Sequence, residues 1–91
     1  MKDTARAVVT VIGKDTVGIL AKVSGVCADV QANVAEVTQS IMQEFFAMIM
    51  MVEIDKMTCD IEELRTKLGA VLPEMQIHVM HEDIFNSMHR I

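Results

Sequence analysis

The chain has 91 residues, of which 52% are hydrophobic and 23% charged, and its formal net charge is −5. This length fits one domain and this apolar fraction excludes disorder, while the negative charge offers no electrostatic attraction for nucleic acid or an anionic membrane surface. Its apolar runs are too short to span a bilayer, its first residues do not resemble a signal peptide, and two cysteines do not make a disulfide framework. We therefore expect one domain over residues 1–91 in the reducing cytoplasm.

The first part of the chain is predicted to form a strand and a helix. Residues 5–12 are rich in Val, Ile and Thr, which favour a strand, and residues 13–16 form a loop. In this loop Asp15 or Thr16 offers an oxygen that could cap a helix over residues 17–31. The apolar side chains of that helix share one face: Ile19, Leu20, Val23, Val26, Cys27 and Val30.

Two strands are predicted next. Residues 34–43 alternate between an apolar and a polar side, which indicates a half-buried strand. Residues 45–54 are apolar on both sides, with Phe46, Met48, Met50 and Val52 facing one way and Phe45, Ala47, Ile49 and Met51 the other. Such a strand must be covered on both faces, and a small two-layer domain covers only one of them itself. This pattern predicts a partner, most simply a homodimer.

The remaining residues predict a second helix, a short strand and a third helix. Thr58 could cap a helix whose apolar face is Ile61, Leu64, Leu68, Val71 and Leu72, and Pro73 ends it. Residues 76–81 form the last strand, and residues 82–91 form an amphipathic helical extension with Ile84, Phe85, Met88 and Ile91 on one side. The order βαββαβ predicts an α+β, ferredoxin-like fold: a four-stranded antiparallel sheet with two helices on one face.

Catalytic and metal chemistry find little support in the sequence. His78 and His81 are three residues apart, a spacing that points them to opposite faces of a strand and disfavours a shared metal. The methionines of residues 48–51 are typical of core or interface packing. No serine lies in a nucleophile elbow, and the first loop has no arginine that could hold a phosphate. We therefore expect no enzyme activity, no cofactor and no metal site.

The loop after the first strand is the most informative stretch. It reads GKDTVGIL at residues 13–20, with two glycines that permit a tight turn or a close approach of the backbone. The helix that follows begins with free N–H groups, which could bind a carboxylate or a phosphate, although a plain strand-to-helix turn has the same spacing. Together with ANVAE at residues 32–36, this loop resembles the ACT domain family, particularly its small free-standing bacterial and archaeal members.

The resemblance implies a regulatory module that pairs with a second copy, binds a small amino acid where the two copies meet, and modulates an enzyme or regulator. By position, Asp15 would contact the polar head of the ligand, and its charge would attract an ammonium group. The other implied ligand-binding positions are Gly13 and Gly18 for the shape of the loop, the backbone of Val17 and Ile19 for the carboxylate, and Asn33. The alternative is a module that binds no ligand and serves protein–protein assembly.

Overall fold

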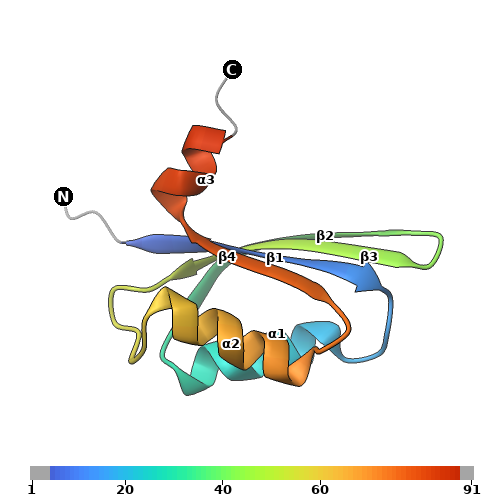
Figure 1. Ribbon diagram of the computed structural model, residues 1–91, viewed down its shortest axis with the longest axis horizontal. Helices are drawn as coiled ribbons and strands as arrows, with labels where there is room; N and C mark the ends of the chain where they lie inside the picture. Colours follow the sequence, from blue (N-terminus) through green and yellow to red (C-terminus); the bar gives the residue numbers. More distant parts are fainter. Residues whose placement is uncertain (1–4, 89–91) are drawn as a thin grey trace.

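The four strands of the chain form one antiparallel sheet with the order β2-β3-β1-β4, and two helices cover one of its faces (Figure 1). The computed structural model describes residues 5–88. Its elements are β1 (Arg6–Lys14), α1 (Ile19–Asp29), β2 (Asn33–Met42), β3 (Phe45–Glu53), α2 (Ile61–Val71), β4 (Gln76–His81) and α3 (Glu82–Met88). The predicted ferredoxin-like βαββαβ order is confirmed, and the bounds of the last strand agree with the prediction.

The core lies between the sheet and the helix pair α1 and α2. Of the two apolar sides of β3, the even-numbered residues are buried there, and the odd-numbered residues face the other side of the sheet. The helices contribute Ile19, Val23, Val26, Cys27, Leu64 and Leu68, and the central strands contribute Ala7, Val9, Val11, Phe46, Met48, Met50 and Val52. Methionine and aliphatic side chains thus make up most of the core, together with Phe46.

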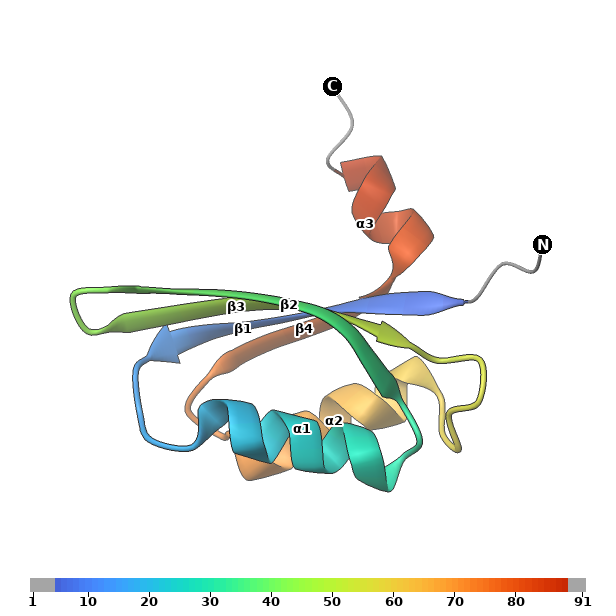
Figure 2. The same cartoon turned by 180° about the vertical axis from the view of Figure 1, so that it is seen from behind.

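The hairpin formed by β2 and β3 extends beyond the ends of both helices (Figures 1 and 2). Its turn contains Gln43 at φ 58°, so the chain reverses without a glycine. The prediction that β2 is half-buried is wrong, because only Val34 is partly buried in that strand. The physical reason is its position, since β2 is an edge strand that runs out past the helices. A bulge after Val34 also places this residue and Val37 on the same face.

The third helix rises away from the sheet at the end of β4, on the side that α1 and α2 leave open (Figure 2). It contacts β1 and β4, but none of its described residues is buried. Val8 points to this side of the sheet and is only 1% exposed, although it lies outside the main core. Glu82 at the start of α3 approaches Arg6 of β1, with 3.9 Å between Oε2 and Nη1. Residues 89–91 of the predicted extension lie outside the described residues.

The predicted helix caps are wrong at both main helices. Gly18, not Asp15 or Thr16, is the N-cap of α1, and no side chain caps that helix. At α2 the cap is Asp60, whose carboxylate accepts a hydrogen bond from the N–H of Glu63 at 2.8 Å. Thr58 comes too early to cap α2 and instead uses its N–H and hydroxyl to bond the carbonyl oxygen of Val30 after α1.

Candidate functional site

The loop between β1 and α1 stands at one end of the molecule and is tied to the neighbouring hairpin. The N–H of Asp15 donates a hydrogen bond to the carbonyl oxygen of Glu44 at 2.7 Å, which fixes the loop beside the hairpin turn. The side chain of Asp15 is exposed and that of Val17 is 97% exposed, whereas Ile19 is buried in the core. Of the implied contacts, Ile19 can therefore offer only its backbone to a ligand.

The two glycines of this loop have different roles. Gly18 adopts φ +85°, a left-handed backbone conformation that costs free energy for residues other than glycine and asparagine. Gly13 has no such strain, but a Cβ atom placed there would come within 2.7 Å of the sulfur of Met75. Gly18 therefore shapes the backbone, and Gly13 makes room for a methionine from the segment that leads into β4.

Asn33 lies near the other end of α1 and is the first residue of β2. Its Nδ2 donates a hydrogen bond to Oε1 of Glu53 at 3.0 Å. The two residues share a cavity of about 350 Å³ with Gln31, Asp55 and Lys56. Because α1 has 11 residues, the helix alone separates Asp15 from Asn33 by about 16 Å. The structure therefore does not bring these two predicted contacts together within one chain.

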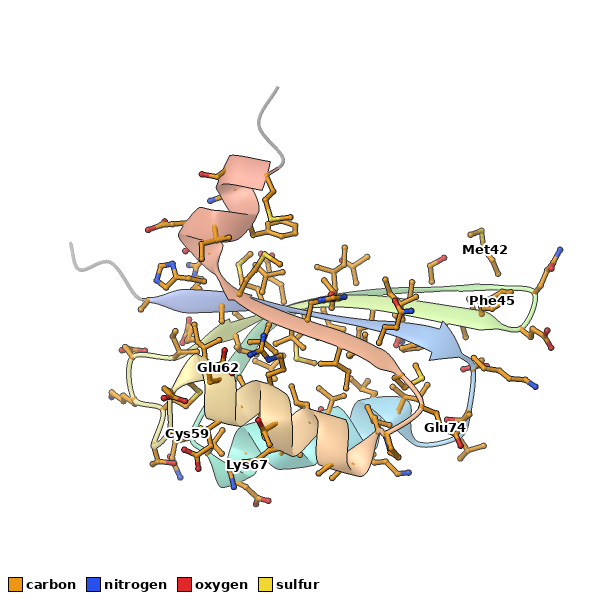
Figure 3. All side chains as sticks on the ribbon, viewed as in Figure 1. Met42, Phe45, Cys59, Glu62, Lys67 and Glu74 are labelled. Atoms are coloured by element: carbon orange, nitrogen blue, oxygen red, sulfur yellow. The ribbon has the colours of Figure 1, made fainter. Side chains whose placement is uncertain are left out.

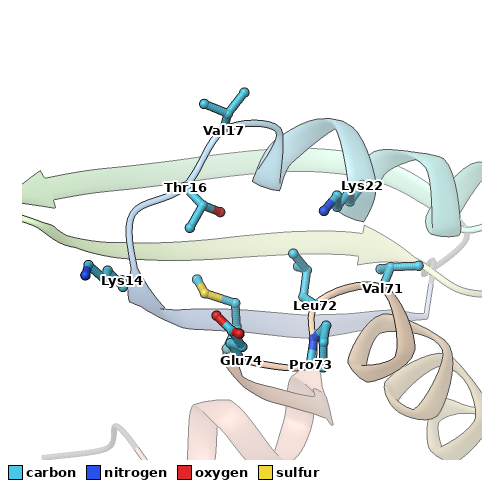
Figure 4. A pocket seen from close by; sticks show the side chains of 9 residues that line it. Lys14, Thr16, Val17, Lys22, Val71, Leu72, Pro73 and Glu74 are labelled. Carbon is cyan, nitrogen blue, oxygen red and sulfur yellow. The ribbon is translucent and has the colours of Figure 1, made fainter.

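A cavity of about 390 Å³ adjoins the first loop on the side that faces the end of α2 (Figure 4). It is lined by Lys14, Thr16, Val17, Lys22, Val71, Leu72, Pro73, Glu74 and Met75. Of these, sequence reasoning singled out only Val17 as a binding residue. The antiparallel pairing of Ile12 with Gln76 places residues 71–75 next to the loop, and the sequence analysis did not predict this pairing.

Neither cysteine is prepared for nucleophilic chemistry. Burial raises the pKa of the Cys27 thiol, which lies in the core. Partial burial raises the pKa of the Cys59 thiol, and the nearby carboxylates of Glu63 and Asp60 raise it further against the opposing effect of Lys67. Both thiols therefore stay protonated near neutral pH more completely than a free cysteine.

Within residues 5–88, no group of three or more His, Cys, Asp or Glu side chains is placed to hold a metal ion. His78 pairs across the sheet with Thr10 and His81 with Ala7, so the two imidazoles belong to opposite faces of β4. None of the described helices combines the length and apolar character needed to cross a membrane.

The comparisons with known proteins agree with this architecture. The family model described as ACT domain matches residues 5–82. A UPF0237 protein of Listeria innocua is 46% identical over 88 residues, covering 94% of this chain and 99% of the relative. The solved ACT domain protein from Streptococcus pneumoniae is 32% identical with a TM-score of 0.75, covering 96% of this chain and 100% of that one. The regulatory subunit of aspartate kinase from Thermus thermophilus is 26% identical with a TM-score of 0.64, covering 88% and 52%. The chain belongs to the ACT domain family.

Proposed function

We propose that this protein is a regulatory module that senses a free amino acid at the interface of a homodimer and thereby modulates a partner enzyme or regulator. The observation that carries the proposal is the separation of Asp15 from Asn33 by the length of α1. Two copies packed with opposite ends of α1 adjacent would complete a site that one chain leaves divided. The similarity to a regulatory subunit of aspartate kinase supports a regulatory role.

The groups at the two ends of α1 could bind the two charged groups of an amino acid. Asp15 is exposed and acidic, so it would attract the ammonium group, and the backbone N–H groups of residues 17–19 at the start of α1 would bind the carboxylate. Asn33 of the second copy would supply an amide that donates or accepts a hydrogen bond. An amino acid has few heavy atoms, so we expect dissociation constants from about micromolar to millimolar, a range suited to sensing metabolite pools.

The mechanism follows from a ligand held by two chains at once. An amino acid that binds better to one relative orientation of the two copies shifts the population toward that orientation. A partner that contacts both copies would read this shift, and the same coupling would make partner binding change amino-acid affinity by an equal factor.

The experiment is a thermal-shift screen of the twenty amino acids, repeated for each hit with Asp15→Ala and Asn33→Ala. Matched controls are Asp29→Ala and Gln39→Ala, which remove an exposed carboxylate and an exposed amide elsewhere. We expect both site variants to lose the stabilisation and both controls to retain it. Unchanged affinity in both site variants would refute the proposed site.

A ligand-free assembly module is the second candidate, and the uncovered part of the sheet favours it. Ile12, Phe45 and Ile49 are exposed on the side away from α1 and α2, and Met42 lies beside Phe45 at the hairpin tip (Figure 3). A cluster of exposed apolar side chains is typical of an interaction surface. Native mass spectrometry of the wild type and Ile49→Lys tests this candidate. A dimer that forms without metabolite, is lost in the variant, and shows no thermal shift with any amino acid would favour assembly.

A further inference from the structure

A histidine stands at the junction between β4 and α3 and caps the helix that follows. His81 is the last residue of β4, and α3 begins directly after it at Glu82. The Nδ1 atom of His81 accepts a hydrogen bond from the backbone N–H of Asp83 at 3.1 Å. Only an unprotonated Nδ1 can accept this bond, so the ring that makes it is neutral and carries its proton on Nε2. The imidazole therefore takes the place of the side-chain oxygen that commonly caps a helix.

The helix that this bond caps has little other support from the fold. α3 has seven residues, and none of them is buried. A helix of this length is marginal in water without packing, because its first turn fixes several residues for one hydrogen bond. Ile84 and Met88 are exposed, and the ion pair between Glu82 and Arg6 joins partly exposed side chains 3.9 Å apart. The cap is therefore a large part of what keeps α3 formed.

Protonation of His81 removes this cap. A protonated ring donates from both nitrogens, so Nδ1 can no longer accept, and the N–H of Asp83 loses its partner. The ring then carries a positive charge at the N-terminus of a helix, where the helix dipole disfavours it. The carboxylate of Asp83 lies 3.7 Å from Nδ1 and attracts the charged ring, but an ion pair with so exposed a side chain contributes little. The balance favours opening of the first turn of α3 as the pH falls.

The elements packed against this junction also carry charged groups. β1 contributes Arg6, whose charge is balanced by Glu82 at the start of α3. The charged residues of α2, which packs against β4, are Glu62, Glu63, Arg65 and Lys67. Among residues 5–88, Asp83 has the only carboxylate within ion-pair distance of the His81 ring. The state of the cap therefore depends mainly on the ring itself and on Asp83.

We propose that His81 makes α3 a pH-sensitive element of the fold. The helix is capped and formed when the imidazole is neutral, and its first turn opens when the imidazole is protonated. α3 contacts β1 and β4 on the side of the sheet that α1 and α2 leave open, so its opening changes the surface that a partner meets on that side. This behaviour does not depend on the proposed amino-acid site, because α3 contributes no residue to that site.

The experiment follows α3 by NMR of the full chain between pH 8 and pH 5.5, at one fixed protein concentration. The Cα chemical shifts of residues 83–88 report the helical population, and those of Leu64 and Leu68 report whether the rest of the domain stays folded. We expect the ratio of helical to open α3 to fall about three- to tenfold as the His81 ring titrates, the effect of losing one cap and gaining an unfavourable charge. A constant ratio would overturn the proposal, and so would a ring that stays neutral down to pH 5.5.

Variants separate the titration of His81 from that of other groups. His81→Asn should keep α3 formed at both pH values, because an asparagine oxygen can accept the same bond and does not titrate. His81→Ala should lower the helical population at both pH values to the same extent. His78→Asn is the matched control and should retain the pH dependence, since His78 lies on the other face of β4. A pH dependence that persists in His81→Asn would assign it to another group and overturn the proposal.

Discussion

Gly18 and Gly25 offer a matched pair for testing how the first loop is built. At both residues, apart from adjacent residues and the backbone of the same helix, no heavy atom lies within 4 Å of the position that a Cβ atom would take, so an added methyl group meets no other part of the fold. They differ in backbone conformation, because Gly18 has φ +85° at the N-cap of α1 and Gly25 lies in the interior of that helix. Substitution by alanine therefore isolates the backbone contribution at each position.

We expect the two substitutions to have opposite signs. Gly18→Ala should destabilise the fold by about 1–2 kcal/mol, the cost of a left-handed alanine. Gly25→Ala should stabilise it by about 0.5–1 kcal/mol, since alanine is the better helix former. Gly18→Asn should cost less than Gly18→Ala, because asparagine tolerates this conformation and caps helices.

Urea unfolding at one fixed protein concentration measures these differences, because any dimer makes stability depend on concentration. With a slope of about 1 kcal/mol per M for a domain of this size, the two alanine variants should differ in midpoint by about 1.5–3 M. A midpoint for Gly18→Ala equal to or above that of Gly25→Ala would refute the assignment of the left-handed cap to Gly18.

Further predictions concern the core, the second helix and a thiol. Met48→Ala should cost about 2–5 kcal/mol in urea unfolding because the side chain is buried, whereas Met42→Ala, at a position 72% exposed, should stay within about 0.5 kcal/mol. Asp60→Ala should cost about 1 kcal/mol by removing the cap of α2, and Asp60→Ser should recover most of it. Cys59 should react with a disulfide reagent more slowly than free cysteine at pH 8, since its raised pKa lowers the thiolate fraction, and Glu63→Gln should speed the reaction. A Cys59 rate that exceeds that of free cysteine would contradict the raised pKa.

The elements with a strong side-chain period were predictable from the sequence. The helical spacing identifies Val23 and Cys27 of α1 and Leu64 and Leu68 of α2 as core residues. In each case the buried residues recur with the period of the backbone, so the local sequence is enough to predict which side chains are buried. The antiparallel order of the strands follows from the short connection at Gln43 and the two intervening helices.

The features that sequence reasoning missed depend on competition between neighbours. Thr58 and Asp60 both have side chains that can cap a helix. Asp60 caps α2 because the helix begins at Ile61, and the hydroxyl of Thr58 instead donates a hydrogen bond to the carbonyl oxygen of Val30. β2 is exposed because the hairpin extends beyond the ends of the helices. The alternation of side chains in β2 gives no information about this length. The cavity at Lys22 and Glu74 joins residues from two segments that approach only in the assembled sheet.

The hydrogen bond from the N–H of Asp15 to the carbonyl oxygen of Glu44 couples the first loop to the hairpin beside it. Because the hairpin extends past the helices, its tip is the part of the sheet where local opening should require the least free energy. Each such opening would release the amide proton of Asp15 to solvent. The exchange rate of that single proton would therefore report how often the tip separates from the loop, and any ligand or partner that clamps the two together would slow it.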